Sequence, residues 1–207
     1  MQGFLETLRI QRWDDHRYYH HSRINQSLHL VSALSFLYGY YLLFVNPAAA
    51  ALVGWLVSML TRQAGHFFFE PKGYDDVNQA THEHKEEIKV GYNLHRKVVL
   101  MAVWVLSPLL LLLSPTLWGL VAPASGKAGI IQQVGMVWLY VGIGGLVFRM
   151  AQLTIQQGFM TAVAWASKIL TDPFHDVMLY WKAPFYLLKG ELLDPMDHAR
   201  DDERQRA

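Results

Sequence analysis

The chain has 207 residues, of which 52% are hydrophobic and 17% are charged, and its formal net charge is +1. Water-soluble domains carry about 25% charged residues, so this composition argues against an ordinary soluble domain. The balanced charge and the lack of a basic, aromatic-interleaved patch argue against nucleic-acid binding, and the absence of cysteine excludes disulfides and thiolate metal ligands.

The first part of the chain predicts a pair of membrane spans. Residues 1–23 are polar and charged, without the apolar core of a secretory signal, so we expect none here. From Ile24 to Thr61 there is no Asp, Glu, Lys or Arg, which is about twice the ~20 residues that a crossing helix needs. Asn46-Pro47 lies near the middle of this stretch and predicts a turn. We therefore predict spans at approximately 28–46 and 48–66, joined by a tight hairpin.

Two further uncharged stretches, residues 98–121 and 128–148, predict spans at approximately 98–119 and 130–149. Between the two pairs of spans lies a polar loop, 67–97. Residues 150–167 are uncharged but contain three glutamines, so we expect an interfacial helix or an extension of the fourth span, followed by a polar tail, 168–207. The prediction is a single all-α domain over 1–207, a polytopic membrane protein with a four-helix transmembrane bundle.

Lysine and arginine are distributed unevenly among the segments that connect these spans. Four arginines precede the first span, six cations lie between residues 62 and 97, and the predicted turn at Asn46-Pro47 has none. By the positive-inside rule, both termini and the 67–97 loop face the cytoplasm. The lack of cysteine and the compact loops favour a bacterial inner membrane, with the endoplasmic reticulum as the location if the source is eukaryotic.

Histidines and amides gather on this predicted cytoplasmic side in two helical stripes. Residues three or four apart share one face of a helix. The stripes are His21, Asn25 and His29 in the first span and Gln63, His66 and Glu70 at the end of the second. A tight hairpin makes the two spans antiparallel neighbours, which can bring the stripes face to face. Imidazole and carboxylate ligands around an open position suit non-haem Fe(II), and the amides can orient the ligands or bind a substrate oxygen.

Other histidines are weaker candidates. His82 and His84 are two residues apart and cannot share a helical face, so at most one joins the site unless the segment is extended, and we favour His84 slightly. Their sequence "THEHKEE" is equally typical of a solvated helix start. His175 in "TDPFHD" is either a ligand or part of a turn capped by Asp172.

These motifs resemble the Fe(II)-dependent 2-hydroxy fatty acid dioxygenases of fatty acid α-oxidation, small multi-span proteins of the endoplasmic reticulum with bacterial relatives. The family pattern is "YYHH", then His-x-x-x-Asn-x-x-x-His, then Gln-x-x-Gly-His-x-x-x-Glu. The matching residues fall within about 17–71: Tyr18, Tyr19, His20, His21, Asn25, His29, Gln63, Gly65, His66 and Glu70. After the glutamate the family has a basic pair and Pro-Ala, whereas this chain has Pro71-Lys72-Gly73-Tyr74.

The resemblance implies an enzyme with one Fe(II) per chain and O₂ as co-substrate, without 2-oxoglutarate. It would cleave a 2-hydroxy fatty acid next to the carboxyl group, leaving a product one carbon shorter. His21, His29 and His66 are the strongest ligand candidates, followed by Glu70 and His84. Arg23, Arg62 or Lys72 could pair with the substrate carboxylate, although each equally suits a positive-inside anchor. Oligomerisation is left open.

Three alternatives remain at this point. A membrane di-iron hydroxylase or desaturase needs around eight histidines, and the chain just reaches that number with His20, His21, His29, His66, His82, His84, His95 and His175. A non-enzymatic haem protein would use His29 and His66 as axial ligands. A structural, membrane-shaping hairpin would bind no metal at all.

Overall fold

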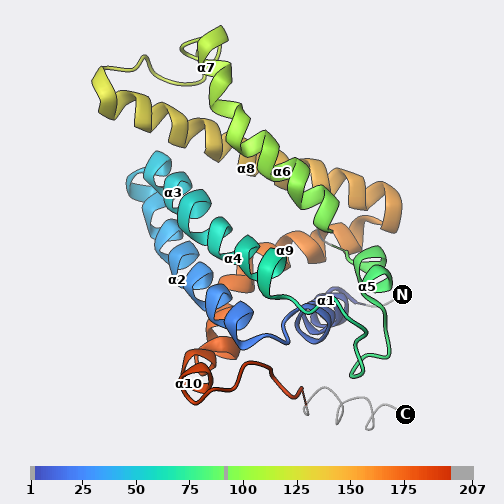
Figure 1. The fold of residues 1–207 in the computed structure, drawn as a ribbon. Coiled ribbons are helices and arrows are strands. Elements are labelled where there is room, and N and C mark those ends of the chain that lie inside the picture. The colour runs from blue at the N-terminus through green and yellow to red at the C-terminus, as the bar shows by residue number, and fades with distance from the viewer. Residues whose placement is uncertain (1–2, 91–92, 197–207) are drawn as a thin grey trace.

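The computed structural model describes residues 3–90 and 93–196, and every regular element in these ranges is a helix. Two long hairpins form most of the molecule, and shorter helices gather at one end of them (Figure 1). The elements are α1 (Phe4–Tyr19), α2 (Arg23–Val45), α3 (Pro47–Val53), η1 (Gly54–Met59), α4 (Leu60–Ala64), η2 (Gly65–Phe69), α5 (His82–Ile88), α6 (Leu94–Leu106), η3 (Ser107–Leu109), α7 (Leu110–Leu113), α8 (Gly126–Gln157), α9 (Phe159–Tyr180) and α10 (Ala183–Leu188).

The first hairpin confirms the predicted turn at Asn46-Pro47. α2 ends at Val45, the side chain of Asn46 accepts a hydrogen bond from the amide of Ala49 at 3.1 Å, and Pro47 occupies the first turn of α3. The following run, residues 47–69, alternates between α-helical and wider π-helical turns and packs along α2. π-helical turns are often found at functional sites, and η2, the last of them, carries His66.

Three helices are long and apolar enough to cross a membrane: Arg23–Val45, Leu94–Leu113 and Gly126–Gln157. They match the first, third and fourth predicted spans and support a membrane protein. None of the separate helices in residues 47–69 reaches that length, so the second span remains a prediction. α8 runs past the predicted boundary at residue 149 to Gln157, so residues 150–157 extend the fourth predicted span. The rest of the uncharged stretch, from Phe159 onward, begins the separate helix α9.

The C-terminal part folds back onto the first hairpin. α9 packs against α1, α2 and α8 (Figure 1), so residues 168–180 form a packed helix and not a polar tail. The sequence "DPFHD" lies inside α9, with Pro173 buried, which corrects the turn expected there. The segment after α10 pairs with the start of α2. The backbone amide of Arg23 donates to the carbonyl of Leu192 at 2.9 Å, and the backbone amide of Asp194 donates to the carbonyl of His21 at 2.7 Å. Residues 197–207 of the predicted tail lie outside the described residues.

Candidate metal centre

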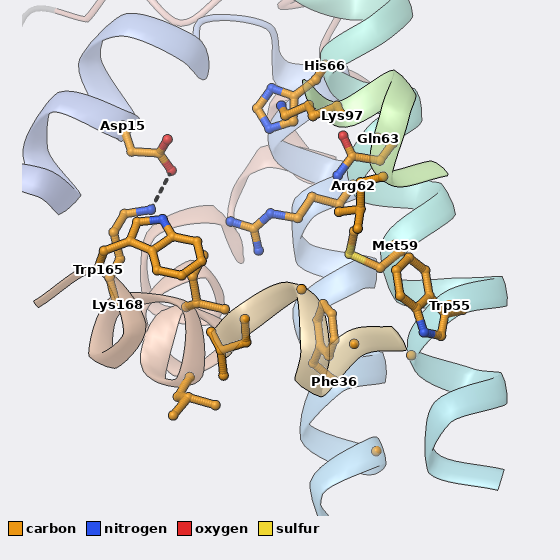
Figure 2. Close-up of a pocket in the computed structure, with 18 of the residues that line it drawn as sticks. Asp15, Phe36, Trp55, Met59, Arg62, Gln63, His66, Lys97, Trp165 and Lys168 are labelled. Atoms are coloured by element: carbon orange, nitrogen blue, oxygen red, sulfur yellow. Dashed lines mark hydrogen bonds and ion pairs between the residues drawn. The ribbon is translucent and has the colours of Figure 1, made fainter. Parts of the chain in front are cut away.

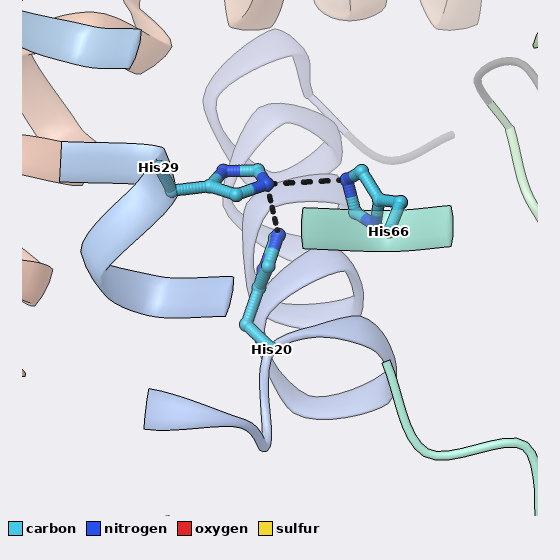
Figure 3. Close-up of side chains that lie close together, drawn as sticks. All are labelled: His20, His29 and His66. Atoms are coloured by element: carbon cyan, nitrogen blue, oxygen red, sulfur yellow. Dashed lines mark hydrogen bonds between the residues drawn. The ribbon is translucent and has the colours of Figure 1, made fainter. Parts of the chain in front are cut away.

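Three buried histidines converge where α1, α2 and η2 meet. His29 Nε2 lies 3.2 Å from His20 Nε2 and 3.2 Å from His66 Nε2 (Figure 3). One ring nitrogen of each histidine lies within 4.8 Å of the other two, an arrangement that could hold a metal ion. The three side chains are almost completely excluded from solvent, with residue exposures of 1% for His20, 0% for His29 and 7% for His66.

The spacing of the nitrogens suits a common ion. A metal–imidazole bond of about 2.0–2.1 Å places two nitrogens on adjacent coordination positions about 3 Å apart. The observed separations of 3.2 Å are close to this value. Each ring nitrogen of a neutral imidazole either donates or accepts a hydrogen bond. If both neighbouring nitrogens present lone pairs, His29 Nε2 can donate its one hydrogen fully to only one of them. A cation at the point between the rings would accept all three lone pairs.

Two of the three imidazoles have a carboxylate behind them. His66 Nδ1 lies 2.8 Å from Glu70 Oε2, and His29 Nδ1 lies 3.5 Å from Asp176 Oδ2. A hydrogen-bonded carboxylate, as Glu70 is to His66, keeps the proton on Nδ1 and leaves the lone pair of Nε2 available to a metal ion. Glu70 would therefore support His66 as a ligand. Asp176 is close to His29 Nδ1 but makes no hydrogen bond with it. Asp176 was not anticipated from the sequence because it is brought in by α9, 147 residues after His29.

Burial sets the protonation of the groups around the centre. Burial, followed by the neighbouring charge of His29, lowers the pKa of His20 well below its usual value, so His20 is neutral near pH 7. Neutral imidazole is the form that binds metal. Burial raises the pKa of Glu70 to about 7, and the positive charges of Lys89 and Lys97 oppose that increase.

The structure places His20 in the group and leaves His21 outside it, contrary to the sequence-based expectation. The expected stripe required a helix from residue 21 onward, but α2 begins only at Arg23, and Ser22 caps it by accepting a hydrogen bond from the amide of Asn25. His20 and His21 therefore lie in the α1–α2 connection and point to different sides. His21 Nε2 contacts the carbonyl of Arg17 and lies 3.7 Å from Asp75.

Asn25 and Gly65 fix the approach of the two helices at the centre. The side-chain amide of Asn25 donates to the carbonyl of Tyr19 at 2.9 Å, which holds the connection that carries His20. A β-carbon built on Gly65 would lie 2.0 Å from Asn25 Oδ1, so only glycine permits this contact. Asn25 thus acts on the position of the ligands through the backbone.

The remaining histidine candidates lie outside the group. His82 is half-buried and His84 is exposed, and both belong to α5, where Thr81 caps the helix by accepting from the amide of His84. This agrees with the solvated helix start. His175 is half-buried on α9 and lines a small pocket beside His20, but it does not join the three ring nitrogens.

The candidate cations have different surroundings. Arg23 lies 2.8 Å from Asp194, at the segment that covers the α1–α2 connection. Arg62 lies 3.6 Å from Asp172 and 3.3 Å from Asp176. Lys72 is exposed. Of the three, only Arg62 lines the cavity beside the histidines.

This cavity has a volume of about 440 Å³ and reaches His66 at one end (Figure 2). Around that end lie polar side chains, including Gln63 and Arg62. Its wall is otherwise mostly apolar and includes Phe36, Trp55, Met59, Leu100, Trp138 and Trp165. Ligand pockets usually measure roughly 300–1,000 Å³ and combine an apolar wall with a few polar groups, and this cavity has both properties.

A buried ionic network joins α1, α4 and α9 beside the cavity. Lys168 lies 3.0 Å from Asp15 and 3.0 Å from Asp172, and Arg62 bridges Asp172 and Asp176. Charges removed from water need such partners. The network links the carboxylate behind His29 to α1, and the sequence alone gave no sign of it because its members are far apart in the chain.

No family model, curated protein or solved structure matches this chain. The functional argument therefore rests on the geometry of the site. Within residues 3–90 and 93–196, that geometry is a buried group of three histidines that could hold a metal ion, at one end of a largely apolar cavity.

Proposed function

We propose that this chain is a membrane-bound, Fe(II)-dependent dioxygenase that shortens 2-hydroxy fatty acids by one carbon. One observation carries the proposal: His66 is both a member of the buried histidine group and part of the wall of a cavity large enough for a lipid-like ligand. The resemblance of residues 17–71 to 2-hydroxy fatty acid dioxygenases supplies the substrate class.

The reaction balances without an external reductant. A 2-hydroxy acid, R–CH(OH)–COOH, and O₂ give R–COOH, CO₂ and water: the bond between the carboxyl carbon and the 2-carbon breaks, and the substrate supplies all four electrons that reduce O₂. This agrees with the absence of a 2-oxoglutarate requirement that the resemblance implies. When bound, Fe(II) would supply open coordination positions for O₂ and for substrate oxygens.

The protein residues have distinct tasks in this proposal. His20, His29 and His66 hold the ion, and Glu70 keeps the proton of His66 on Nδ1. The charge of Asp176, 3.5 Å from His29 Nδ1, favours the same tautomer of His29 without a hydrogen bond. Burial of the histidines keeps bulk water from the reacting centre. The half of the cavity lined by α2, η1 and α8 takes the acyl chain.

We further propose that residues 47–69 cross the membrane as the second of four spans. The run packs along α2 as the return arm of a tight hairpin, and its π-helical turns leave the helical path continuous. With the cations of the 62–97 segment on the cytoplasmic side, both termini are cytoplasmic and the metal centre lies at the inner face of a bacterial inner membrane, or of the endoplasmic reticulum if the source is eukaryotic.

The geometry favours one ion over the alternatives. A di-iron enzyme needs around eight histidines, whereas the described residues bring three together. Axial haem ligands would have to lie on opposite faces of a porphyrin, but His29 and His66 approach to 3.2 Å and His20 lies against both rings. A purely structural hairpin gives no reason for three imidazole nitrogens to share one buried point.

The test is turnover of a defined substrate. Purified protein, loaded with Fe(II) without oxygen, is mixed with 2-hydroxypalmitate and O₂, and the products are identified by mass spectrometry. We expect one O₂ consumed for each pentadecanoate formed, and no turnover of palmitate, which lacks the 2-hydroxyl group. Iron-loaded protein that leaves 2-hydroxypalmitate unchanged would reject the proposed activity.

A further inference from the structure

The ion pairs of the cations that line the cavity show which cation is available to a ligand. Four cations line it: Arg62, Lys89, Lys97 and Lys168. Arg62 and Lys168 are neutralised by the carboxylates of the ionic network. Lys89 lies 3.7 Å from Glu86. The backbone amide of Lys97 donates to the carbonyl of Asn93, but its side-chain ammonium group makes no hydrogen bond or ion pair with any described residue.

The acidic residues of the cavity wall are also paired. Asp14 lies 3.1 Å from Arg17, and Asp15 lies 3.0 Å from Lys168. No carboxylate of the cavity wall is therefore left for Lys97. Glu70, which interacts electrostatically with Lys97 but does not line the cavity, is already hydrogen-bonded to His66 Nδ1 at 2.8 Å. The side chain of Lys97 is nonetheless deeply buried, with a residue exposure of 8%. A buried ammonium group without a counter-ion is unfavourable unless something supplies the missing negative charge.

The position of Lys97 indicates what kind of ligand supplies the missing negative charge. Lys97 lies in the first turn of α6 and projects into the polar end of the cavity beside His66 and Gln63 (Figure 2). Apolar side chains occupy most of the remaining wall. A ligand that suits both the polar end and the apolar wall of the cavity carries one anionic group at the end of a long apolar chain.

We propose that Lys97 binds the carboxylate of a long-chain fatty acid whose acyl chain fills the cavity. This inference rests on the proposed function and names the residue that recognises the acid, in place of the sequence-based candidates Arg23, Arg62 and Lys72. The ammonium group donates a charge-assisted hydrogen bond to the carboxylate. Because His66 lies at the same end of the cavity, the carbon next to the bound carboxylate is held near the histidine group.

The experiment measures ligand binding by the full-length protein without added iron. Radiolabelled palmitate and methyl palmitate have the same chain, but only palmitate carries the negative charge. We expect Lys97→Met to weaken palmitate binding by about 10–100-fold, the range for losing a hydrogen bond to a charged group, and to change methyl palmitate binding less than 2-fold. Lys97→Arg keeps the charge and should retain most of the affinity. Lys127→Met, which removes an exposed lysine of α8, is the matched control and should bind as the wild type does.

Folding of the variants is checked by tryptophan fluorescence during heating. Because Lys97→Met removes a buried charge without a partner, we expect its Tm in the absence of ligand to equal or exceed that of the wild type. In the wild type, palmitate should raise Tm more than methyl palmitate does, a comparison that needs no variant.

The outcomes separate this inference from the proposed function. Palmitate binding that depends on Lys97, in a protein that does not turn over 2-hydroxypalmitate, supports the carboxylate site and rejects the dioxygenase. Turnover of 2-hydroxypalmitate together with unchanged palmitate affinity in Lys97→Met overturns the inference alone. Tighter binding of hexadecyl phosphate than of palmitate would also overturn it, because the site would then be built for a phosphate group.

Discussion

His66 Nδ1 lies 2.8 Å from Glu70 Oε2, while Nε2 of the same ring faces His29 Nε2 at 3.2 Å. Each nitrogen of His66 therefore has a separate task. The hydrogen bond to Glu70 fixes the ring orientation and the tautomer, and the other nitrogen is left to bind an ion. His66 lies within η2, which ends at Phe69, and the backbone becomes extended at Glu70.

Removing the charge of Glu70 should weaken metal binding without abolishing it. Glu70→Gln keeps the size of the side chain but loses the carboxylate behind His66, and such losses usually cost 10–100-fold in metal affinity. Titration of the metal-free protein with Fe(II) or Zn(II) measures the effect. Glu83→Gln changes an exposed glutamate of α5 and is the control. Equal affinities of Glu70→Gln and the wild type would show that Glu70 does not support the centre.

Two neighbouring histidines give the sharpest test of the ligand set. His20→Ala removes one of the three converging nitrogens and should abolish stoichiometric metal binding and activity. His21→Ala removes a side chain that faces Asp75 and should keep the bound metal. Metal content after gel filtration measures both. Loss of metal in His21→Ala together with its retention in His20→Ala would restore the ligand set expected from the helical stripe.

A single methyl group at Gly65 should disturb the centre. In Gly65→Ala the new β-carbon would lie 2.0 Å from Asn25 Oδ1, so η2 or α2 must shift. Overpacking of this kind costs about 1–3 kcal/mol of folding free energy, and we expect a lower Tm and weaker metal binding. Gly144→Ala is the control, because a β-carbon there meets nothing within 4 Å and helix propensity favours alanine. The prediction fails if the two variants have the same Tm and the same metal affinity.

The segment after η2 should show a defined pH dependence. Burial acts to raise the pKa of Asp75, but hydrogen bonds from Asn78 and the charges of His21 and Lys85 outweigh it and hold the pKa below 3.8. Ionised Asp75 therefore stabilises the fold above that pH, and the contribution is lost as the pH falls through the lowered pKa.

Asp75→Asn leaves the buried Lys85, 3.3 Å away, without its carboxylate. At pH 7 we expect a loss of about 3–5 kcal/mol, measured by tryptophan fluorescence during thermal unfolding in detergent. The difference from the wild type should shrink below about pH 4, as the wild-type carboxyl group becomes protonated. Asp76→Asn, at an exposed position, should behave as the wild type does. A difference that stayed constant down to pH 2 would contradict the argument from charge.

Much of the fold was predictable because membrane spans leave a strong local signal. Uncharged stretches identified three helices of sufficient length, and Asn46-Pro47 identified the hairpin. The approach of His29 to His66 followed from that hairpin. The choice between His20 and His21 depended on where α2 begins. Ser22, which caps α2, was the sequence signal that would have placed this boundary.

The contributions of α9 and α6 were not predictable from the sequence. Asp176 and the ionic network reach the centre through packing of α9 against α1 and α2, which no local pattern records. Lys97 looked like one of six cations that anchor a cytoplasmic loop. Only the structure places it in a cavity wall whose other charges are paired.

The central claim is that His20, His29 and His66 hold one metal ion, and metal analysis of the purified protein tests it most directly. After anaerobic loading with Fe(II) and removal of excess metal, we expect one iron per chain in the wild type and none in His29→Ala. Protein that is folded by its thermal unfolding curve yet retains no iron or other transition metal would contradict the account.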